Sequence, residues 1–190
     1  MPSLLLASQS PRRKQLLKES GFSFVTQASY VSEEVPSGFS PVQTVEELAR
    51  RKAESVFCNH PDKLVIGADT VVACGSDILG KPKTKEEARQ MLCQLSAASH
   101  EVYSGTALIS KHVKKVFHVK TEVVFYPLDE ALVEAYIATE EPFDKAGAYG
   151  IQGRGRLFVK KLNGDYFNVV GLPIARVARE LEQCGIYPAF

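Results

Sequence analysis

The sequence has few of the features that mark membrane, secreted or nucleic-acid-binding proteins. Its 190 residues include only four cysteines, which lie far apart and form no Cys-x-x-Cys pair, so neither a zinc site nor a redox motif is indicated. The 23 basic and 22 acidic side chains nearly cancel, which argues against the broad basic surface that duplex binding requires. No apolar run approaches the roughly 18 residues of a membrane span, and the first residues do not resemble a secretion signal. We therefore expect a soluble cytoplasmic protein with no nucleic-acid or membrane partner.

Common catalytic and nucleotide-binding motifs are missing as well. Neither Gly-x-x-x-x-Gly-Lys-Ser/Thr nor Gly-x-Gly-x-x-Gly occurs between a strand and a helix, which disfavours a P-loop or a dinucleotide-binding domain. The four histidines are isolated and have no Gly-x-Ser-x-Gly partner motif, so we assign them no catalytic role. The composition, 45% hydrophobic and 24% charged, is that of an average globular protein without repeats or linkers. This predicts one domain over residues 1–190.

Segments typical of strands and helices alternate along the chain. Strands are expected at residues 4–7, 22–27, 64–72, 100–110, 116–126, 157–162 and 167–170, and helices at residues 11–20, 41–57, 84–95, 129–138 and from 173 to a glycine cap at 185. Hairpins are expected at residues 111–115 and at Asn163-Gly164, and the Gly- and Pro-rich residues 140–155 are expected to form mainly a structured loop. Thr84 and Glu87 predict a capping box. The pattern predicts an α/β domain with a mixed sheet, whose ligands gather where strands pass into loops and helices.

Two arginines stand at the start of the first predicted helix, where they oppose the helix dipole. Residues 4–13 run from a buried strand through a serine-rich turn to Arg12 and Arg13. Backbone N–H groups, serine hydroxyls and guanidinium groups that meet at one point would suit a phosphate. In the alternative interpretation Ser10 is only the N-cap and Pro11 only the first helical residue, and both arginines extend into solvent.

Three carboxylates stand out for their positions. Asp69 lies within the apolar residues 64–72, where it must be desolvated unless the strand ends there. Gly67, just before it, leaves room for the close approach of a ligand or of another backbone segment. Alternatively, Asp69 makes a local turn or a structural hydrogen bond. Glu33 and Glu34 lie in a polar loop, and carboxylates at separate sites could hold Mg²⁺ or orient water, although a solvated acidic loop is the commoner explanation.

Basic residues occur singly at positions that suggest a site rather than a charged surface. Lys81 is presented rigidly by its glycine and proline neighbours. Lys52 is an exposed helix lysine unless the fold turns it inward. The Gly-rich residues 145–153 begin with Lys145 and would let the backbone approach a ligand, and Gln152 could recognise a base edge. Alternatively, this segment is only a glycine-rich turn between two elements.

Five motifs occur together in this chain: Ala7-Ser8-Gln9-Ser10-Pro11-Arg12-Arg13, Ile66-Gly67-Ala68-Asp69-Thr70, Gly80-Lys81-Pro82, Asp144-Lys145-Ala146-Gly147-Ala148-Tyr149-Gly150-Ile151-Gln152-Gly153 and Asn168-Val169-Val170-Gly171-Leu172-Pro173. In this order and approximate spacing they resemble the Maf family of nucleoside triphosphate pyrophosphatases, over about residues 4–174. The resemblance implies an inosine triphosphatase-like α/β fold, with a mixed, strongly twisted central sheet flanked by helices and a deep cleft. It also implies hydrolysis of a nucleoside triphosphate to the monophosphate and pyrophosphate, with Mg²⁺ or Mn²⁺ as the cofactor.

The resemblance further implies roles for individual residues. The implied catalytic set is Asp69, Glu33, Lys52 and Lys81, with Asp69 as the general base and Glu33 and Asp69 as metal ligands. Phosphate contacts are implied for Ser8, Arg13, Lys52, Lys81 and Lys145, and selection of the base for Arg12, Thr70 and Gln152. Asp144 is a further residue to consider. The combination of Arg12, Thr70 and Gln152 is similar to the branch that acts on dTTP and UTP, not to the branch that favours 7-methyl-GTP.

Two other functions stay open beside this house-cleaning of nucleotide pools. One is a pyrophosphatase for deaminated purine nucleotides such as ITP or XTP. The other is a nucleotide-responsive binding protein that acts on cell division, because Maf members are associated with inhibition of septum formation. The preferred nucleotide, modified pyrimidines included, the formation of a homodimer and partners among cell-division proteins are left open by the sequence.

Overall fold

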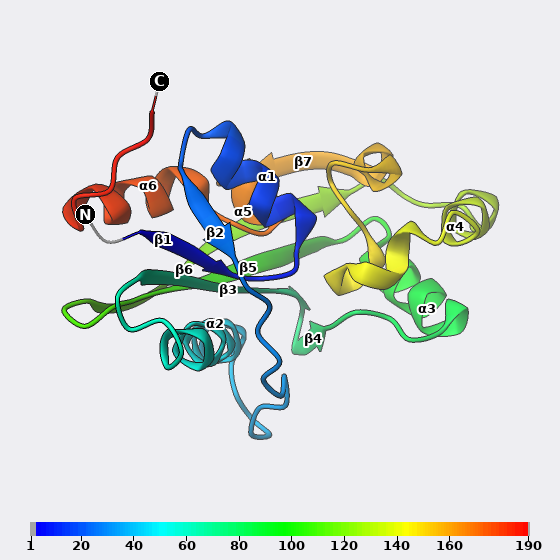
Figure 1. Cartoon of the computed structure of the whole chain (residues 1–190). Helices are drawn as coiled ribbons and strands as arrows, with labels where there is room; N and C mark the ends of the chain where they lie inside the picture. Colours follow the sequence, from blue (N-terminus) through cyan, green and yellow to red (C-terminus); the bar gives the residue numbers. More distant parts are fainter. Residues whose placement is uncertain (1–2, 190) are drawn as a thin grey trace. The chain divides into compact units, whose positions relative to one another are not determined.

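A computed structural model describes residues 3–189 as an α/β structure (Figure 1). Its strands are β1 (Leu4–Ala7), β2 (Phe24–Thr26), β3 (Leu64–Cys74), β4 (Asp77–Leu79), β5 (Ser99–Ile109), β6 (Lys114–Phe125) and β7 (Val159–Asn163). Its α-helices are α1 (Pro11–Glu19), α2 (Pro41–Phe57), α3 (Lys85–Leu95), α4 (Glu130–Ile137), α5 (Tyr166–Val170) and α6 (Ile174–Gln183), and its 3₁₀-helices are η1 (Glu141–Asp144), η2 (Ala146–Ala148) and η3 (Arg154–Phe158). Among these helices, none has both the length and the apolar character that a bilayer crossing needs.

The strands form a seven-stranded mixed sheet, which confirms the predicted fold class. The strand order is β2-β1-β3-β5-β6-β7, and β4 pairs with β3 outside this path. β1 runs parallel to β2 and to β3, whereas the β3–β4 and β6–β7 pairs are antiparallel. β5 and β6 are neighbours joined by a turn in which the N–H of Ser110 bonds the carbonyl of Val113 at 2.8 Å, so the first predicted hairpin is also confirmed.

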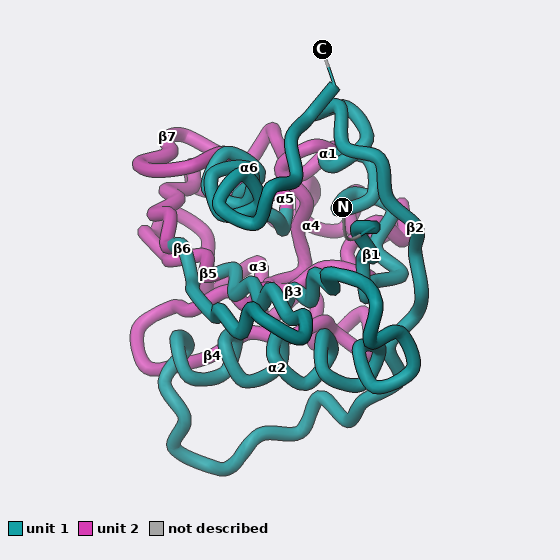
Figure 2. Tube along the Cα trace, turned by 60° about the vertical axis from the view of Figure 1, so that its left-hand side comes forward, with its two compact units in different colours: residues 1–69, 104–119, 171–190 teal, residues 70–103, 120–170 magenta. Residues whose placement is uncertain are grey.

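The chain divides into two compact units, which Figure 2 colours separately. Unit 1 comprises Met1–Asp69, Ser104–Val119 and Gly171–Phe190, and unit 2 comprises Thr70–Tyr103 and Lys120–Val170. The single domain predicted over residues 1–190 stays a prediction, and its ends, residues 1–2 and 190, lie outside the described residues. The deep cleft implied by the family resemblance also stays a prediction.

In unit 1 the backbone of α2 rests directly on two glycines of the sheet. A Cβ atom at Gly67 on β3 would lie 2.2 Å from the carbonyl oxygen of Ala49, and one at Gly105 on β5 would lie 2.2 Å from that of Val45. Either side chain would collide with helix backbone, so only glycine permits this packing. The close approach predicted at Gly67 is therefore confirmed, and the partner is another backbone segment. This packing places α2 beside the part of β3 that carries Asp69.

In unit 2 the core is built around aromatic rings packed edge to face. The Phe125 ring lies 4.7 Å from that of Tyr149 and 5.7 Å from that of Phe158, measured between centroids. His100 is 2% exposed and its Nε2 atom lies 2.8 Å from the hydroxyl of Tyr149. Burial lowers the pKa of His100 to about 4, because the imidazolium form would be poorly solvated there.

The predicted helix starts are formed, with one difference in detail. Ser10 caps α1, and its Oγ accepts from the N–H of Arg13 at 3.4 Å. Thr84 caps α3 in the same way, accepting from the N–H of Glu87 at 3.1 Å. The reciprocal half of the predicted capping box is wrong, because the Glu87 carboxylate accepts from the N–H of Lys83 at 2.7 Å. The carboxylate thus bonds the N–H one residue earlier in the chain than a capping box requires.

The strand predicted at residues 167–170 is wrong, because Tyr166–Val170 forms helix α5. The Oδ1 atom of Asp165 accepts from the N–H of Phe167 at 2.8 Å, which favours a helix start. The buried Asn168 side chain donates 3.0 Å hydrogen bonds to a carbonyl of β5 and to a hydroxyl of β6. These tertiary contacts override the hairpin signal of the preceding Asn-Gly dipeptide.

Three shorter segments differ from the expectation in extent. Residues 140–155 do form a structured loop, but it contains η1, η2 and the start of η3. The strand expected from residue 157 begins at Val159, since the residues before it belong to η3. The three-residue strand β4 was not expected, because its alternation is too short to distinguish from a turn.

Candidate functional site

Lys52 joins two of the predicted carboxylates in unit 1. Its Nζ atom lies 2.6 Å from Oδ1 of Asp69 and 2.6 Å from Oε1 of Glu33. The side chains of Lys52 and Asp69 are only 12% and 11% exposed, whereas that of Glu33 is 52% exposed. Lys52 is therefore turned inward, and a single ammonium group holds the two carboxylate oxygens close together.

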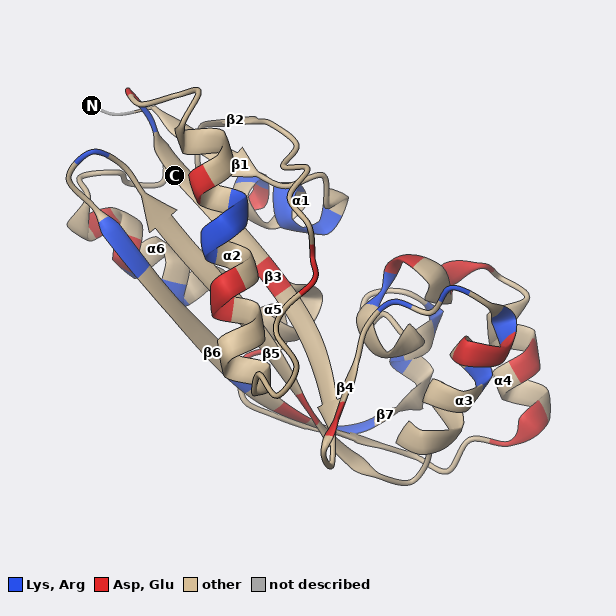
Figure 3. Cartoon of the chain, turned by 90° about the horizontal axis from the view of Figure 1, so that it is seen from below, with Lys and Arg blue, Asp and Glu red and all other residues tan. Residues whose placement is uncertain are grey.

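The packing of α2 on β3 explains why Lys52 reaches Asp69. Residues two apart on a strand point to the same face, so Asp69 shares the face of Gly67 that α2 covers. Ala49 and Ala53, which contact Gly67, flank Lys52 on the helix. Helix α2 carries charges of both signs in succession (Figure 3), and Lys52 is the cation that this packing places beside the buried carboxylate.

Arg13 is anchored beside the same carboxylate and does not extend into solvent. Its Nε donates to the carbonyl oxygen of Gly171 at 2.7 Å and its Nη1 to that of Ala68 at 2.8 Å. Burial lowers the pKa of Arg13 below its ordinary value, while the charge of Asp69 acts to raise it. The guanidinium stays charged, because an arginine pKa is too high for ordinary burial to remove the proton. The Nη1 atom of Arg13 is thus bonded to Ala68, the residue of β3 directly before Asp69.

The turn before α1 supplies the remaining predicted residues of unit 1. The Oγ atom of Ser8 accepts from the N–H of Ser10 at 3.2 Å, which orders the turn. Arg12 follows at the first turn of α1, and its charge acts on the neighbouring Arg13 guanidinium. Unit 1 therefore contains six of the predicted site residues, which are Ser8, Arg12, Arg13, Glu33, Lys52 and Asp69.

Unit 2 joins the segments that carry Lys81 and Lys145. The N–H of Gly147 donates to the carbonyl of Gly80 at 3.0 Å, so the Lys81 turn is bonded to the η2 segment. The Nζ atom of Lys145 donates to Oδ1 of Asp144 at 2.5 Å, and the Lys145 side chain is 13% exposed. The Asp144 carboxylate therefore pairs with the Lys145 ammonium in this structure.

Glu141, which the sequence reasoning missed, organises the loop that carries Gln152. Its Oε2 accepts from the N–H of Arg154 at 3.0 Å, and its Oε1 accepts from the Tyr136 hydroxyl at 3.0 Å. Burial acts to raise the pKa of Glu141, but these hydrogen bonds outweigh it and hold the pKa below its usual range. A Cβ at Gly153 would lie 1.9 Å from the carboxylate, so a larger residue there would displace the Glu141 side chain from these contacts. The sequence signal is weak, because a glutamate before proline reads as a solvated loop residue.

Of the three residues predicted to select the base, Thr70 lies on β3 and Gln152 lies in the loop between η2 and η3, both in unit 2. Thr70 directly follows Asp69 on β3, so their side chains point to opposite faces of the strand. Gln152 lies between η2 and η3, and its carbonyl accepts a hydrogen bond from the guanidinium of Arg156. Their roles in base selection stay predictions.

Comparison with known proteins gives this arrangement a family. The sequence model of Maf-like proteins matches residues 3–184. The chain belongs to the Maf family. A "dTTP/UTP pyrophosphatase" of Geobacillus sp. (strain WCH70) is 52% identical over 185 residues, covering 97% of this chain and 100% of that protein. The protein of the same name from Bacillus pumilus (strain SAFR-032) is 51% identical over 188 residues, covering 99% of this chain and 100% of its own.

A more distant likeness is to a solved structure, that of a HAM1 protein from Coxiella burnetii. Its TM-score is 0.41 at 16% identity, and the match covers 66% of this chain and 73% of that chain. The likeness is too weak to bear on the site. Membership of the Maf family rests on the matches in sequence.

Glu33 and Asp69 are two carboxylates of unit 1 whose chemistry suits a divalent cation. Among residues 3–189 no cluster of three or more His, Cys, Asp or Glu side chains is arranged to hold a metal. Mg²⁺, however, takes only one or two protein carboxylates where waters and substrate phosphates complete its shell. Two carboxylates held close together by Lys52 match such a donor set.

Proposed function

We propose that this chain hydrolyses dTTP and UTP to the nucleoside monophosphate and pyrophosphate, as a house-cleaning enzyme of nucleotide pools. The observation that carries the proposal is the pairing of Lys52 with Glu33 and Asp69, next to the anchored Arg13 guanidinium. Support also comes from Maf-family relatives about half identical to this chain, which are named dTTP/UTP pyrophosphatases.

In the proposed reaction a water molecule attacks the α-phosphorus while Asp69 accepts its proton. The bond between the α-phosphorus and the bridging oxygen breaks, and pyrophosphate leaves with that oxygen. The hydrogen bond from Lys52 fixes the orientation of the Asp69 carboxylate. Arg13 supplies positive charge beside it. Catalysis of this kind depends chiefly on positioning and on neutralising the charge of the phosphates.

A divalent cation is the expected cofactor, since nucleotide pyrophosphatases of this family generally depend on one. We propose that Glu33 and Asp69 would hold Mg²⁺ or Mn²⁺ together with phosphate oxygens of the substrate. When bound, such a cation neutralises charge on the triphosphate and favours the departure of pyrophosphate.

The remaining residues of the proposed site bind and select the nucleotide. Ser8, Lys81 and Lys145 are proposed to contact phosphates, and Arg12, Thr70 and Gln152 to select the base. The Lys145 ammonium can release its present hydrogen bonds for a phosphate, since an ammonium group has rotatable donors and no fixed geometry. A pyrimidine preference follows from this assignment and from the names of the relatives.

The decisive assay measures both products over a panel of triphosphates. With Mg²⁺ or Mn²⁺ present, dTTP and UTP are expected to yield equal amounts of monophosphate and pyrophosphate, faster than CTP, ITP or XTP. Release of orthophosphate would overturn the proposed bond cleavage. A preference for ITP or XTP would favour the deaminated-purine alternative.

The role of Asp69 is tested by Asp69→Asn, which keeps the size and removes the base. Turnover is expected to fall by about 10²- to 10⁴-fold, the contribution typical of a general base, while nucleotide binding remains measurable. Asp62→Asn is the matched control, because the Asp62 side chain is 73% exposed and lies in a turn. Near-normal turnover of Asp69→Asn would remove Asp69 from its role.

The homodimer, the cell-division partners and the cytoplasmic location remain predictions. A measured mass in solution tests the first. A division phenotype that survives Asp69→Asn would favour a binding role over catalysis.

A further inference from the structure

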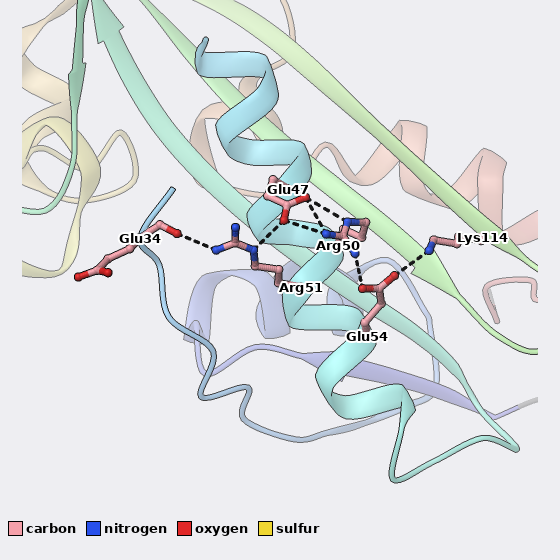
Figure 4. A network of polar contacts seen from close by, with 6 residues as sticks. All are labelled: Glu34, Glu47, Arg50, Arg51, Glu54 and Lys114. Carbon is pink, nitrogen blue, oxygen red and sulfur yellow. Dashed lines mark hydrogen bonds and ion pairs between the residues drawn. The ribbon is translucent and has the colours of Figure 1, made fainter. Parts of the chain in front are cut away.

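The loop that carries Glu33 is attached to helix α2 through its main chain. Residues 27–36, between β2 and α2, have no regular secondary structure. Arg51 on α2 donates from Nη1 to the carbonyl oxygen of Glu34 at 2.7 Å. The Glu34 carboxylate points away from this contact (Figure 4), so the backbone of the loop is what Arg51 holds.

Arg51 belongs to a chain of ion pairs that fixes its own orientation. Figure 4 shows the network of Glu34, Glu47, Arg50, Arg51, Glu54 and Lys114. The Nε atom of Arg51 donates to Oε1 of Glu47 at 2.7 Å, one turn earlier on α2. The Arg51 and Glu47 side chains are 30% and 23% exposed, so this pair is partly shielded from water. Glu47, on the same helix, thus orients the Arg51 guanidinium toward the loop.

The contact made by Arg51 is adjacent to the contact at the site. Consecutive residues of α2, Arg51 and Lys52, bond consecutive residues of the loop, Glu34 and Glu33. The Lys52–Glu33 bond is made by the end of the Glu33 side chain, which is 52% exposed. The Arg51–Glu34 bond is made by the main chain and restrains the peptide next to Glu33.

We propose that Arg51 is a positioning residue of the catalytic site, which holds the loop so that Glu33 stays within reach of Lys52 and Asp69. The catalytic consequence of this positioning rests on the proposed function. The positioning itself rests only on the hydrogen bonds that Arg51 and Lys52 make in unit 1. Arg51 touches none of the reacting groups, so its effect must pass through Glu33.

Arg50 provides a matched control on the same helix. It bonds the same carboxylate, with Nη2 at 2.8 Å from Oε1 of Glu47. Its other ion pair is with Glu54, which also accepts from Lys114 on β6 at 2.8 Å. Loss of Arg50 therefore removes a charge and its hydrogen bonds to Glu47 without removing the bond from Arg51 to the Glu34 carbonyl.

The first test compares Arg51→Ala, Arg51→Lys and Arg50→Ala in dTTP hydrolysis. Arg51→Ala is expected to lower kcat by about 10- to 100-fold, with a smaller change in KM, because a displacement of about 1 Å at a reacting group costs up to about 10². Arg50→Ala is expected to stay within about 3-fold of the wild type. Arg51→Lys, which keeps a cationic donor, should recover part of the loss. An equal loss of kcat in Arg51→Ala and Arg50→Ala would overturn the proposal.

A double-mutant cycle shows whether Arg51 acts through Glu33. In a Glu33→Ala background, Arg51→Ala is expected to cost less than about 3-fold in kcat, since the group it positions is gone. If the two losses instead multiply, Arg51 does not act through Glu33 and the proposal fails.

A second test does not depend on catalysis. Amide hydrogen exchange at residues 32–35 should quicken at least 10-fold in Arg51→Ala and stay unchanged in Arg50→Ala, with α2 protected in both. If the wild type hydrolyses no triphosphate while this difference is seen, the proposed function fails and the attachment of the loop stands. Unchanged exchange in Arg51→Ala would overturn the attachment, whatever the activity.

Discussion

Replacing Gly67 with alanine is expected to push helix α2 away from β3 at the point where Lys52 meets Asp69. The new Cβ would lie 2.2 Å from the carbonyl oxygen of Ala49, 2.6 Å from the nitrogen of Ala53 and 2.9 Å from the Cβ of Ala53. Two of these atoms are backbone, so no side-chain rotation relieves the overlap. The helix must retreat by roughly 1 Å or more before the contacts become acceptable.

The size of the effect follows from this overlap. Inserting a methyl group into a packed core usually costs about 1–3 kcal/mol of unfolding free energy. In a chain of this length that corresponds to a fall in Tm of roughly 2–12 °C. The same retreat stretches the 2.6 Å bond between Lys52 and Asp69, and a displacement of about 1 Å lowers catalysis by about 10².

The assay pairs urea and thermal unfolding with dTTP hydrolysis, and Gly105→Ala is the matched variant. A Cβ at Gly105 would also lie 2.2 Å from an α2 carbonyl, that of Val45, two turns before Lys52. Both variants should lose similar stability, whereas kcat should fall about 100-fold in Gly67→Ala and less than about 10-fold in Gly105→Ala. If Gly67→Ala keeps its stability within about 0.5 kcal/mol and its kcat near the wild-type value, this account of how α2 delivers Lys52 is refuted.

Two further predictions concern unit 2. Gln152→Ala should change the ratio of kcat/KM between dTTP and CTP by about 10- to 100-fold with little loss of stability, as measured over the nucleotide panel, and an unchanged ratio would remove Gln152 from base selection. His100 has a pKa of about 4 in the fold against an ordinary value of 6.5, so the unfolded chain takes up a proton that the folded chain does not. The stability present above pH 6.5 is therefore lost as the pH falls toward 4, by up to about 3 kcal/mol. Urea unfolding between pH 7 and 4.5 should show a shallower pH dependence in His100→Gln, and equal slopes would contradict the assignment.

Much of the fold could be predicted from local sequence signals, because those signals act within a few residues. Ser10 and Thr84 accept N–H groups three residues later, so a cap is visible in sequence before any tertiary structure forms. The run that becomes β3 is mostly apolar and rich in β-branched residues, as a strand buried on both faces requires. Helix α5 could not be predicted in this way, since the bonds of Asn168 join segments 47 and 66 residues away.

The candidate site was predictable by family resemblance more than by local pattern. The inward turn of Lys52 depends on Gly67, which lies 15 residues later on another element. Periodicity along α2 alone does not reveal that contact. Glu141 escaped notice for a related reason, because its carboxylate is bonded to the N–H of Arg154, and main-chain N–H groups leave no mark in the sequence.

The arginines at the start of α1 can now be explained by the charges around them. Arg13 is stabilised where the helix dipole opposes it, because two carbonyl oxygens accept from it and Asp69 lies beside it. Among the proposed site residues of unit 1, three are positively charged, namely Arg12, Arg13 and Lys52. Asp69 and Glu33 are negatively charged, so the net charge of this set is +1. A triphosphate brings more negative charge than these residues balance, even when the proposed phosphate contacts Lys81 and Lys145 are added. The proposed reaction therefore needs further positive charge, and the closeness of Glu33 to Asp69 is what would let a divalent cation supply it.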